Sequence, residues 1–244
     1  MISVAMATYN GEKYIVEQLD SIYNQTVKAD EVIICDDGSK DNTQSIIRNY
    51  IVDKKLENKW KLYINEKQLG YIENFRKAIT LTAGEYIFLS DQDDIFYPNK
   101  FEKMINVMHT HDDCMLLNAN FEIIDENGIV TNNMRDKSRK RVKGIRKIDF
   151  RQWLFESFPG FSMCLRYPMR DRIKNADFRN CYGHDIILGL IALDSNGNYE
   201  MDEVLSGYRM HFSNVTGGKN ITNDYTVSNR VKQKNKELEC YNRQ

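Results

Sequence analysis

Three carboxylates stand close together at Asp91, Asp93 and Asp94, directly after the apolar segment Glu85 to Ser90. Carboxylate oxygens are ligands that Mg²⁺ and Mn²⁺ prefer, and like charges this close repel one another when no cation is present. The spacing therefore favours a divalent cation, held together with a phosphate group. The alternative is a solvated acidic loop that precedes a helix starting near Pro98.

Polar residues also follow two earlier apolar segments, in the stretches ATYNGE and CDDGSKDN. In the first, Tyr9 offers an aromatic ring for stacking on a base, and Thr8 and Asn10 offer polar groups for its edge. In the second, Asp37 could accept hydrogen bonds from a base N–H or a ribose hydroxyl, although Asp-Gly-Ser is also ordinary turn chemistry. The sequence contains neither the Gly-x-Gly-x-x-Gly nor the P-loop pattern, so dinucleotide and P-loop sites lose their main support.

The elements that must position these groups follow a βαβ pattern in the first half of the chain. Helical spacing of apolar residues predicts a helix ending near Gln25, a second that begins within 39–42, and a third from about Tyr71 to a stop at Gly84. In a doubly wound, mostly parallel α/β sheet, ligands bind at the carboxyl ends of the strands, so we expect the polar clusters to converge there. The four predicted strands are Ile2–Thr8, Glu31–Cys35, Lys61–Ile64 and Glu85–Ser90.

The second half of the chain is less regular. We expect a helix after Pro98, a strand, turn and return over 114–130, a helix that opens at Asp185, a late strand near Tyr208 and a helical or frayed tail. The basic run Arg135 to Lys147 predicts a mobile loop or a junction between halves. The sequence thus divides into a regular first half (1–130), a less regular second half (131–220) and a charged tail (221–244).

Composition excludes several classes of protein. The 34 Lys and Arg residues nearly balance the 35 Asp and Glu residues, which argues against a nucleic-acid partner. The five cysteines show no metal-ligand or disulfide spacing, which favours a reducing cytoplasm. The sequence shows no secretory leader and no apolar run near the roughly 18 to 20 residues that a membrane span needs.

The ordered set of motifs resembles family 2 glycosyltransferases with the GT-A fold. The resemblance covers roughly residues 1 to 217, and its motifs are ATYNGEKYIVEQLDSIYNQT, EVIICDDGSKDNT, GYIENFRKA, GEYIFLSDQDDIFYPNK, GHDIILGLIAL and GYRMHFSNVTG. The combination of SDQDD, His-Asp and Tyr-Arg-x-His-x-x-Asn looks most like the branch of rhamnosyltransferases that act on bacterial surface polysaccharides. The motifs taken together are far more specific than any one of them.

The resemblance implies a role for each motif. Asp91 would lie near the ribose or phosphate and Asp93 would be the direct ligand of Mn²⁺ or Mg²⁺, with His211 able to reach the metal or the diphosphate. Asp185 matches the catalytic base, although the commoner Glu-Asp dipeptide is His184-Asp185 here. The remaining matches are Thr8, Tyr9 and Asp37 for the nucleotide, Asn74 for the donor pocket, and Asn214 beside His211.

These roles predict an inverting, metal-dependent glycosyltransferase that moves rhamnose or a hexose from a dTDP- or UDP-sugar. The expected acceptor is a hydroxyl of a surface polysaccharide or of a lipid-linked glycan. With such an acceptor, the basic run Arg135 to Lys147 could make a peripheral contact with the inner membrane face, whereas its default interpretation is a solvated loop. The alternatives are a nucleotide-sugar binding module, an inactive transferase and, less favoured, a nucleotidylyltransferase. The last class requires a glycine-rich basic loop after the first strand, whereas ATYNGEKY has one Gly and one Lys.

Overall fold

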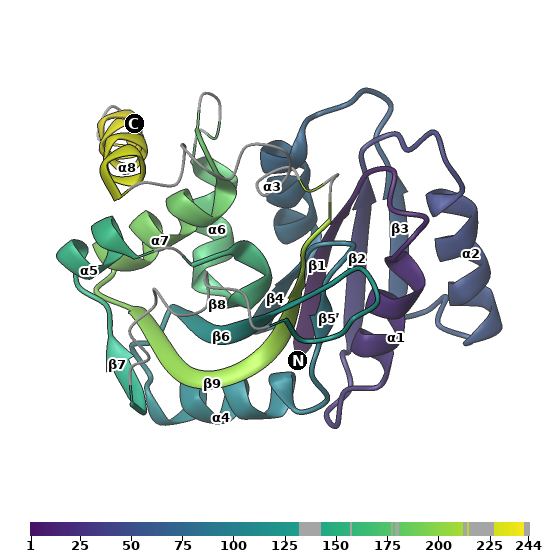
Figure 1. Cartoon of the computed structure of the whole chain (residues 1–244), viewed down its shortest axis with the longest axis horizontal. Coiled ribbons are helices and arrows are strands. Elements are labelled where there is room, and N and C mark those ends of the chain that lie inside the picture. The colour runs from purple at the N-terminus through teal and green to yellow at the C-terminus, as the bar shows by residue number, and fades with distance from the viewer. Residues whose placement is uncertain are drawn as a thin grey trace.

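The structure of the protein is a computed structural model. It describes residues 1–131, 143–156, 158–176, 178, 181–211, 214 and 227–241. A single mixed sheet runs through the molecule, with helices on both of its faces (Figure 1). The predicted doubly wound, mostly parallel α/β sheet is therefore confirmed.

Within the described residues, the sheet has nine strands in the order β3-β2-β1-β4-β8-β6-β9-β5, and β7 pairs with β9 beside this path. β3, β2, β1 and β4 are mutually parallel. The strands are β1 (Ile2–Thr8), β2 (Glu31–Asp36), β3 (Trp60–Ile64), β4 (Tyr86–Ser90), β5 (Ile95–Phe96), β6 (Leu116–Ile124), β7 (Ile145–Lys147), β8 (Met163–Arg166) and β9 (Asn198–Arg209).

The parallel strands end at the same level. Thr8 at the end of β1 is paired with Asp36 at the end of β2, and Met6 is paired with Ser90 at the end of β4. Because parallel strands carry their carboxyl ends to one edge, the residues that follow β1, β2 and β4 meet there. This register is what brings the predicted polar clusters together.

Helices cover both faces of the sheet, and each face has its own apolar core. Val4 and Met6 point into the core beneath α1, α2 and α4, while the alternate residues Ala5 and Ala7 point into the core beneath α3, α5, α6 and α7. The helices are α1 (Ile15–Tyr23), α2 (Thr43–Asp53), α3 (Tyr71–Leu81), α4 (Lys100–Thr110), α5 (Phe150–Phe155), α6 (Pro168–Asn175), α7 (His184–Asp194) and α8 (Val227–Tyr241).

β9 is the longest strand and closes the second half of the sheet. It curves across the molecule beside β6 (Figure 1) and pairs in parallel with that strand. Near its carboxyl end, Ser206 and Gly207 pair antiparallel with Phe96 and Ile95 of β5, the two-residue strand that follows the acidic loop. β9 thereby brings residues beyond position 206 next to the end of β4.

Several sequence predictions need correction. The helix α6, the 3-10 turn Gly160–Ser162 and the short strands β5 and β7 were not predicted. Helix α7 begins at His184 with Gly183 as its N-cap, so Asp185 is the second helical residue. Gly84 is not a left-handed C-terminal residue of α3; a Cβ there would lie 2.3 Å from Ser3 Oγ, so Gly84 allows close approach to β1.

The basic run Arg135 to Lys147 is described only in part, because residues 132–142 lie outside the described residues. Its last three residues form β7, which pairs antiparallel with β9 and is therefore not a loop. Arg146 forms ion pairs with Glu156 and Glu200, and Lys147 Nζ lies 2.7 Å from Asp113 Oδ2. These two cations are thus paired within the fold.

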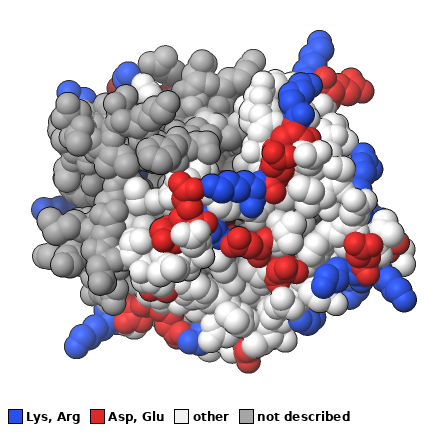
Figure 2. Space-filling model, turned by 45° about the vertical axis from the view of Figure 1, so that its right-hand side comes forward, with Lys and Arg blue, Asp and Glu red and all other residues white. Residues whose placement is uncertain are grey.

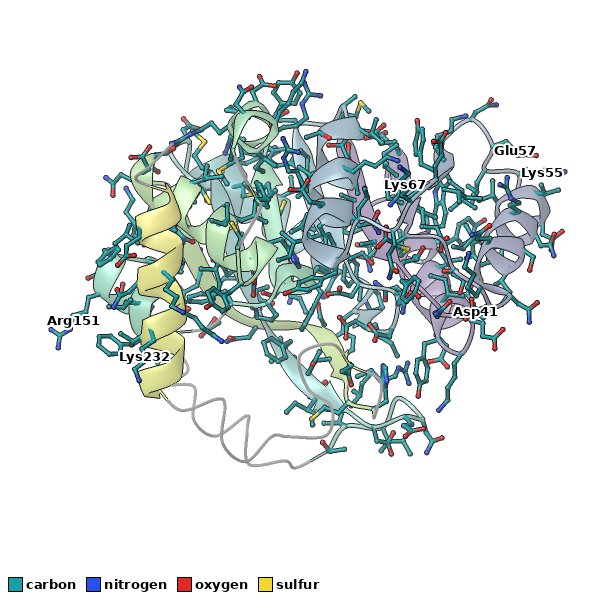
Figure 3. All side chains as sticks on the ribbon, turned by 90° about the horizontal axis from the view of Figure 1, so that it is seen from above. Asp41, Lys55, Glu57, Lys67, Arg151 and Lys232 are labelled. Carbon is teal, nitrogen blue, oxygen red and sulfur yellow. The ribbon has the colours of Figure 1, made fainter. Side chains whose placement is uncertain are left out.

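The C-terminal segment that we expected to be a helical or frayed tail contains helix α8. Lys234 on α8 is buried and its Nζ donates to the carbonyl oxygens of Trp153 and Glu156 at the end of α5. Seen from above in Figure 3, Lys232 on α8 and Arg151 on α5 lie at one end of the molecule, and Asp41 and Lys55 at the other.

The surface carries mixed charge. On the face shown in Figure 2, Lys and Arg side chains are interspersed with Asp and Glu over the described residues, without a broad patch of one sign. Three of the cysteines that the structure describes, Cys35, Cys114 and Cys164, are buried free thiols. Within the described parts of the chain, none of the helices combines the length and the apolar character needed to cross a membrane.

Candidate functional site

The three carboxylates of the acidic loop point to different partners. Asp91 and Asp93 are half-buried, whereas Asp94 is buried. Asp93 Oδ2 lies 2.8 Å from His211 Nε2, and Asp94 Oδ1 accepts a hydrogen bond from the backbone N–H of Arg209 at 3.1 Å. The loop therefore separates into Asp91 and Asp93, which face the site, and Asp94, which is tied to β9.

The electrostatics of the acidic loop show strong crowding. Burial, followed by the neighbouring charges of Asp93 and Asp185, raises the pKa of Asp91 to about 8. Burial, together with Asp93 and Asp91, raises the pKa of Asp94 well above its ordinary value. A bound cation would reduce the repulsion between these carboxylates and so favour their charged form.

Beneath the loop lies a buried cation, Lys100. Its Nζ donates to Phe161 O at 2.9 Å and to Ser206 Oγ at 2.7 Å, and its burial lowers its pKa to about 7. The nearby Asp94 raises that pKa, and Asp94 Oδ2 is buried without a hydrogen-bond partner. Lys100 links the acidic loop electrostatically to β9 and to the turn before β8.

Asp185 joins the same site from the opposite half of the chain. It stands in the first turn of α7, and its charge contributes to the raised pKa of Asp91. It also lines a small pocket of about 20 Å³ together with Trp153, Met163 and Asn198. The predicted base Asp185 is therefore close enough to act electrostatically on Asp91, although 94 positions separate the two residues in the chain.

His184 is buried on the other side of α7. Its ring stacks on Phe75 at a centroid distance of 4.0 Å, with Tyr71 edge-on at 6.2 Å. Both ring nitrogens are buried without a hydrogen-bond partner, and burial lowers the pKa of His184. The residue therefore packs α7 against α3 as a neutral imidazole, and Gly160 makes room for it because a Cβ there would lie 2.3 Å from Nε2.

One side of the expected nucleotide site, formed by Asp37, Asn65 and Asn74 and called here the nucleotide wall, lies at the end of β2. Asp37 is buried and accepts hydrogen bonds from Leu69 N at 2.7 Å, Gly70 N at 2.8 Å and Asn65 Nδ2 at 2.8 Å. The left-handed φ of +81° at Gly70 allows the loop to turn there. Asp37 thus holds the loop after β3 against the end of β2.

Asn74 completes this wall from α3. It is buried, its Oδ1 accepts a hydrogen bond from Asn65 Nδ2 at 2.9 Å, and its Nδ2 donates to Cys35 O at 2.8 Å. Asn74 therefore supports Asn65 and the end of β2 from behind.

The residues after β1 divide into supporting and exposed positions. The Thr8 hydroxyl is buried and donates to Asp36 Oδ2 at 2.9 Å, so it braces the β1–β2 edge. Tyr9 is 42% exposed. Asn10 has a left-handed φ of 49°, and its Oδ1 accepts from Lys40 N at 2.8 Å. Among these three residues, Tyr9 has the free aromatic surface that a base would need.

Four residues of the site were missed by sequence reasoning. Gln92 exchanges two hydrogen bonds with the backbone of Tyr9, at 2.8 and 3.0 Å, and so joins the acidic loop to the end of β1. Asn65 donates to Asp37, Tyr14 packs beside His211, and the Arg209 guanidinium lies over the Tyr14 ring. Gln92, Tyr14 and Arg209 lie within the quoted motifs, which was the local signal, whereas Asn65 lies outside them and acts through contacts distant in sequence.

The described residues of the late motif are hydrogen-bonded to one another after the end of β9. Asn214 Oδ1 accepts from His211 N at 2.6 Å, and Asn214 Nδ2 donates to Arg209 O at 3.1 Å. The Tyr14 ring lies 4.9 Å from the His211 ring. These contacts fix His211 with its imidazole towards Asp93.

The described residues include no group of three His, Cys, Asp or Glu side chains arranged to hold a metal ion. A cation at this site would therefore be bound by Asp93 and Asp91 and by oxygen atoms of a ligand. This donor set fits Mg²⁺ or Mn²⁺ with a diphosphate, because such ions are commonly bound through one or two carboxylates plus substrate phosphates.

Comparison with known proteins places this geometry in a family. The family model for glycosyl transferase family 2 matches residues 3–172. An uncharacterized glycosyltransferase of Methanocaldococcus jannaschii is 35% identical over 157 residues, which is 63% of this chain and 52% of that protein. A UDP-Glc:alpha-D-GlcNAc-diphosphoundecaprenol beta-1,3-glucosyltransferase of Escherichia coli is 32% identical over 130 residues, 53% of this chain and 49% of that protein.

Solved structures show the same fold. S. aureus TarS 1-349 in complex with UDP-GlcNAc has a TM-score of 0.69 at 19% identity, covering 87% of this chain and 59% of that chain. The mannosyltransferase PcManGT from Pyrobaculum calidifontis, in complex with GDP-Man and Mn²⁺, has a TM-score of 0.59 at 17% identity, covering 88% and 58%. The chain spans about half the length of the two curated relatives. Because the family model matches more than half of its residues, this chain belongs to glycosyltransferase family 2 and has the GT-A-like α/β fold.

Proposed function

We propose that this chain transfers a sugar from a nucleoside diphosphate donor to an acceptor hydroxyl, with inversion at the anomeric carbon. The observation that carries the proposal is the contact between Asp93 and His211 at the acidic loop, with Asp185 near enough for its charge to act on the neighbouring Asp91. A base and a diphosphate site placed together are what a single in-line displacement requires. Family membership supports the same class of reaction.

The donor would lie along the carboxyl ends of β1, β2 and β4. Tyr9 would stack on the base, Asp37 would accept a hydrogen bond from the base or ribose, and Asn10 and Asn74 would complete the wall. Because Asp37 already accepts three hydrogen bonds within the protein, it is rigidly aimed before the nucleotide arrives. The UDP-GlcNAc complex of TarS supports a UDP-sugar, and the sequence motifs favour dTDP-rhamnose or a UDP-hexose.

Mn²⁺ or Mg²⁺ would be held by Asp93 and Asp91, with His211 turning from Asp93 towards the metal or the diphosphate. When bound, the ion would neutralise charge on the departing diphosphate. The crowding that raises the pKa of Asp91 supports a cation here, and the Mn²⁺ complex of PcManGT is consistent with it. Asp91 would also lie nearest the ribose or the first phosphate.

Asp185 would take the proton from the attacking acceptor hydroxyl. Its place in the first turn of α7, which is packed against α3 through the His184 ring, would hold the carboxylate in one direction. His184 and Asn214 would act as supporting residues on the acceptor side. Proton transfer by a positioned carboxylate typically contributes about 10²- to 10⁴-fold to the rate.

The acceptor would be a hydroxyl of a bacterial surface polysaccharide or of a lipid-linked glycan. The name of the Escherichia coli relative describes a diphosphoundecaprenol-linked acceptor for that protein, which supports the lipid-linked alternative. Such an acceptor would place the chain at the inner face of the membrane as a peripheral protein. Flotation with anionic liposomes at moderate salt tests this contact, and the absence of binding would remove it.

Each of the three segments predicted from the sequence would have its own role in the reaction. Residues 1–130 would bind the donor, residues 131–220 would supply the base and the acceptor side, and residues 221–244 would form an accessory segment. The alternatives are a nucleotide-sugar binding module or an inactive transferase. Family membership gives the nucleotidylyltransferase alternative no support.

Nucleotide release distinguishes the enzyme from a binding module. We expect nucleotide release from one member of a panel of UDP-, dTDP- and GDP-sugars with Mn²⁺ and acceptor. Asp185→Asn should lower the rate by about 10²-fold or more while donor binding, measured by calorimetry, stays within a factor of about two. The matched control is Asp194→Asn at the other end of α7. Full activity in Asp185→Asn would rule out this base.

A further inference from the structure

Arg209 is a fully buried charged side chain to which the sequence motifs assign no role. It is the last residue of β9, its side chain is 0% exposed, and it stands two residues before His211. Arginine is almost never fully buried unless its donors are paired. The partners of Arg209 therefore indicate what its burial accomplishes.

Its first set of partners is the acidic loop. Arg209 N donates to Asp94 Oδ1 at 3.1 Å, and Arg209 Nε donates to Asp93 O at 2.8 Å. Backbone and side chain thus bind two consecutive residues of the loop to the end of β9. The same strand end carries the His211 imidazole to within 2.8 Å of Asp93 Oδ2.

Its second set of partners anchors the guanidinium from the other side. Arg209 Nη2 lies 2.5 Å from Glu17 Oε2 on α1, and Nη1 donates to Glu126 O at 2.9 Å. The guanidinium also lies over the Tyr14 ring at 4.6 Å, and that ring is 4.9 Å from the His211 ring. Arg209 therefore contacts α1, the turn after β6 and the acidic loop at once.

We infer that Arg209 is the positioning residue of the metal-diphosphate site: a built-in cation that holds Asp93 and His211 in place before a metal binds. This inference rests on the proposed function for the metal itself. The planar guanidinium directs its donors to the backbone carbonyls of Asp93 and Glu126 and to the Glu17 carboxylate in fixed directions. A lysine has neither the fork nor the reach to all of these partners.

The test compares Arg209→Lys with Arg166→Lys. Arg166 is the last residue of β8 and lies beside the start of β4. Arg166 pairs with Tyr86 at the start of that strand, and its guanidinium likewise donates to backbone carbonyls, those of Cys114 and Met108. Both substitutions should lower the melting temperature. Only Arg209→Lys should weaken Mn²⁺ binding, by about tenfold or more, as the loss of an outer-shell partner typically does.

Mn²⁺ binding would be measured on the purified full chain by electron paramagnetic resonance, with Mn²⁺ alone as the probe. Hydrogen exchange of residues 88–96 in the metal-free protein gives a readout that does not depend on the metal. Arg209→Lys should speed exchange there, and Arg166→Lys should not. Wild-type Mn²⁺ affinity together with wild-type exchange in Arg209→Lys would overturn the inference.

Two outcomes separate this inference from the proposed function. If the wild-type chain binds Mn²⁺ neither alone nor in the presence of UDP, dTDP or GDP, the metal in the proposed function is wrong, and the exchange of 88–96 alone decides whether Arg209 positions the loop. If Arg209→Lys does not fold, Glu17→Gln replaces it, because Glu17 is 51% exposed and its loss removes a partner of Arg209 without burying a new group. Glu17→Gln should then weaken Mn²⁺ binding severalfold and speed the same exchange; no change in either would overturn the inference.

Discussion

His211 Nε2 lies 2.8 Å from Asp93 Oδ2, which joins two residues that are 118 positions apart in the chain. The contact crosses from the end of β9 to the loop after β4 and defines one side of the proposed metal-diphosphate site. Substitutions at the two positions should therefore reveal which residue holds the metal directly.

Asp93→Asn should impair Mn²⁺-dependent transfer more than His211→Gln. The first substitution removes a carboxylate ligand, and we expect the Mn²⁺ concentration for half-maximal activity to rise by at least about 100-fold. The second removes a partner of that ligand and should raise it about 10- to 100-fold. Metal titrations of the two variants, with Asp112→Asn as a surface control, give the order; a larger effect at His211 would make the histidine the primary ligand.

Substitutions of the adjacent buried residues Asp36 and Asp37 should have different effects. Asp36→Asn should lower stability, whereas Asp37→Asn should also weaken nucleotide binding. Asp36 accepts from Thr8 Oγ1 at 2.9 Å and from Ser39 N at 2.8 Å, so Asp36→Asn should cost about 2 to 3 kcal/mol of unfolding free energy. Asp37→Asn should in addition raise the dissociation constant of the nucleotide about tenfold or more. Urea unfolding and calorimetry measure the two effects. If Asp36→Asn weakens nucleotide binding as much as Asp37→Asn, the assignment of Asp37 to the nucleotide fails.

The stability of the protein should depend on pH through His184. Its pKa is lowered by burial in the folded state, so below the ordinary value of about 6.5 the unfolded chain binds a proton that the folded chain does not. The stabilisation is therefore complete above about pH 6.5 and is lost as the pH falls through the lowered pKa. The loss amounts to at most about 1.4 kcal/mol per pH unit.

Unfolding of wild type and His184→Phe between about pH 7.5 and 5.5 measures this effect. Phenylalanine retains a ring to pack against Phe75 and cannot take up a proton. The variant should lose part of the pH dependence, whereas His109→Gln, an exposed histidine, should keep most of it. Identical pH dependence in wild type and His184→Phe would show that His184 is protonated equally in both states.

Gly160 and His184 should be energetically coupled. A Cβ at position 160 would lie 2.3 Å from His184 Nε2, so Gly160→Ala should cost about 1 to 3 kcal/mol of unfolding free energy through overpacking. The cost should largely disappear in a His184→Ala background, where the ring is absent. A double-mutant cycle by urea unfolding tests the coupling, and simple additivity would place the strain elsewhere.

The sequence predicted the parallel half of the fold closely. β1 has the predicted bounds, and β2, β3 and β4 differ from prediction by one residue at one end. Alternating apolar residues and helical spacing are local properties, so they can be recognised without knowing what packs against what. The polar residues that follow these strands could be assigned to one edge for the same reason, because a parallel sheet brings its carboxyl ends together.

The sequence predicted the mixed half less well. β5 and β7 have two and three residues, which is too short for a periodic signal, and both are stabilised by pairing with β9. Helix α6 has low overall apolarity, and its packing depends on Met169 and Ile173. Strands and helices of this kind are fixed by partners distant in sequence, so local patterns do not identify them.

For the candidate site, the sequence by itself determined which residue types are available: the acidic loop, Asp37, the His184-Asp185 pair and the late histidine. Only the tertiary structure decided how they divide. It tied Asp94 to the backbone of Arg209, set Asp93 against His211 and brought Asp185 close enough to affect Asp91. The physical reason is that hydrogen bonds and charge interactions act over a few ångströms in space, whatever the separation along the chain.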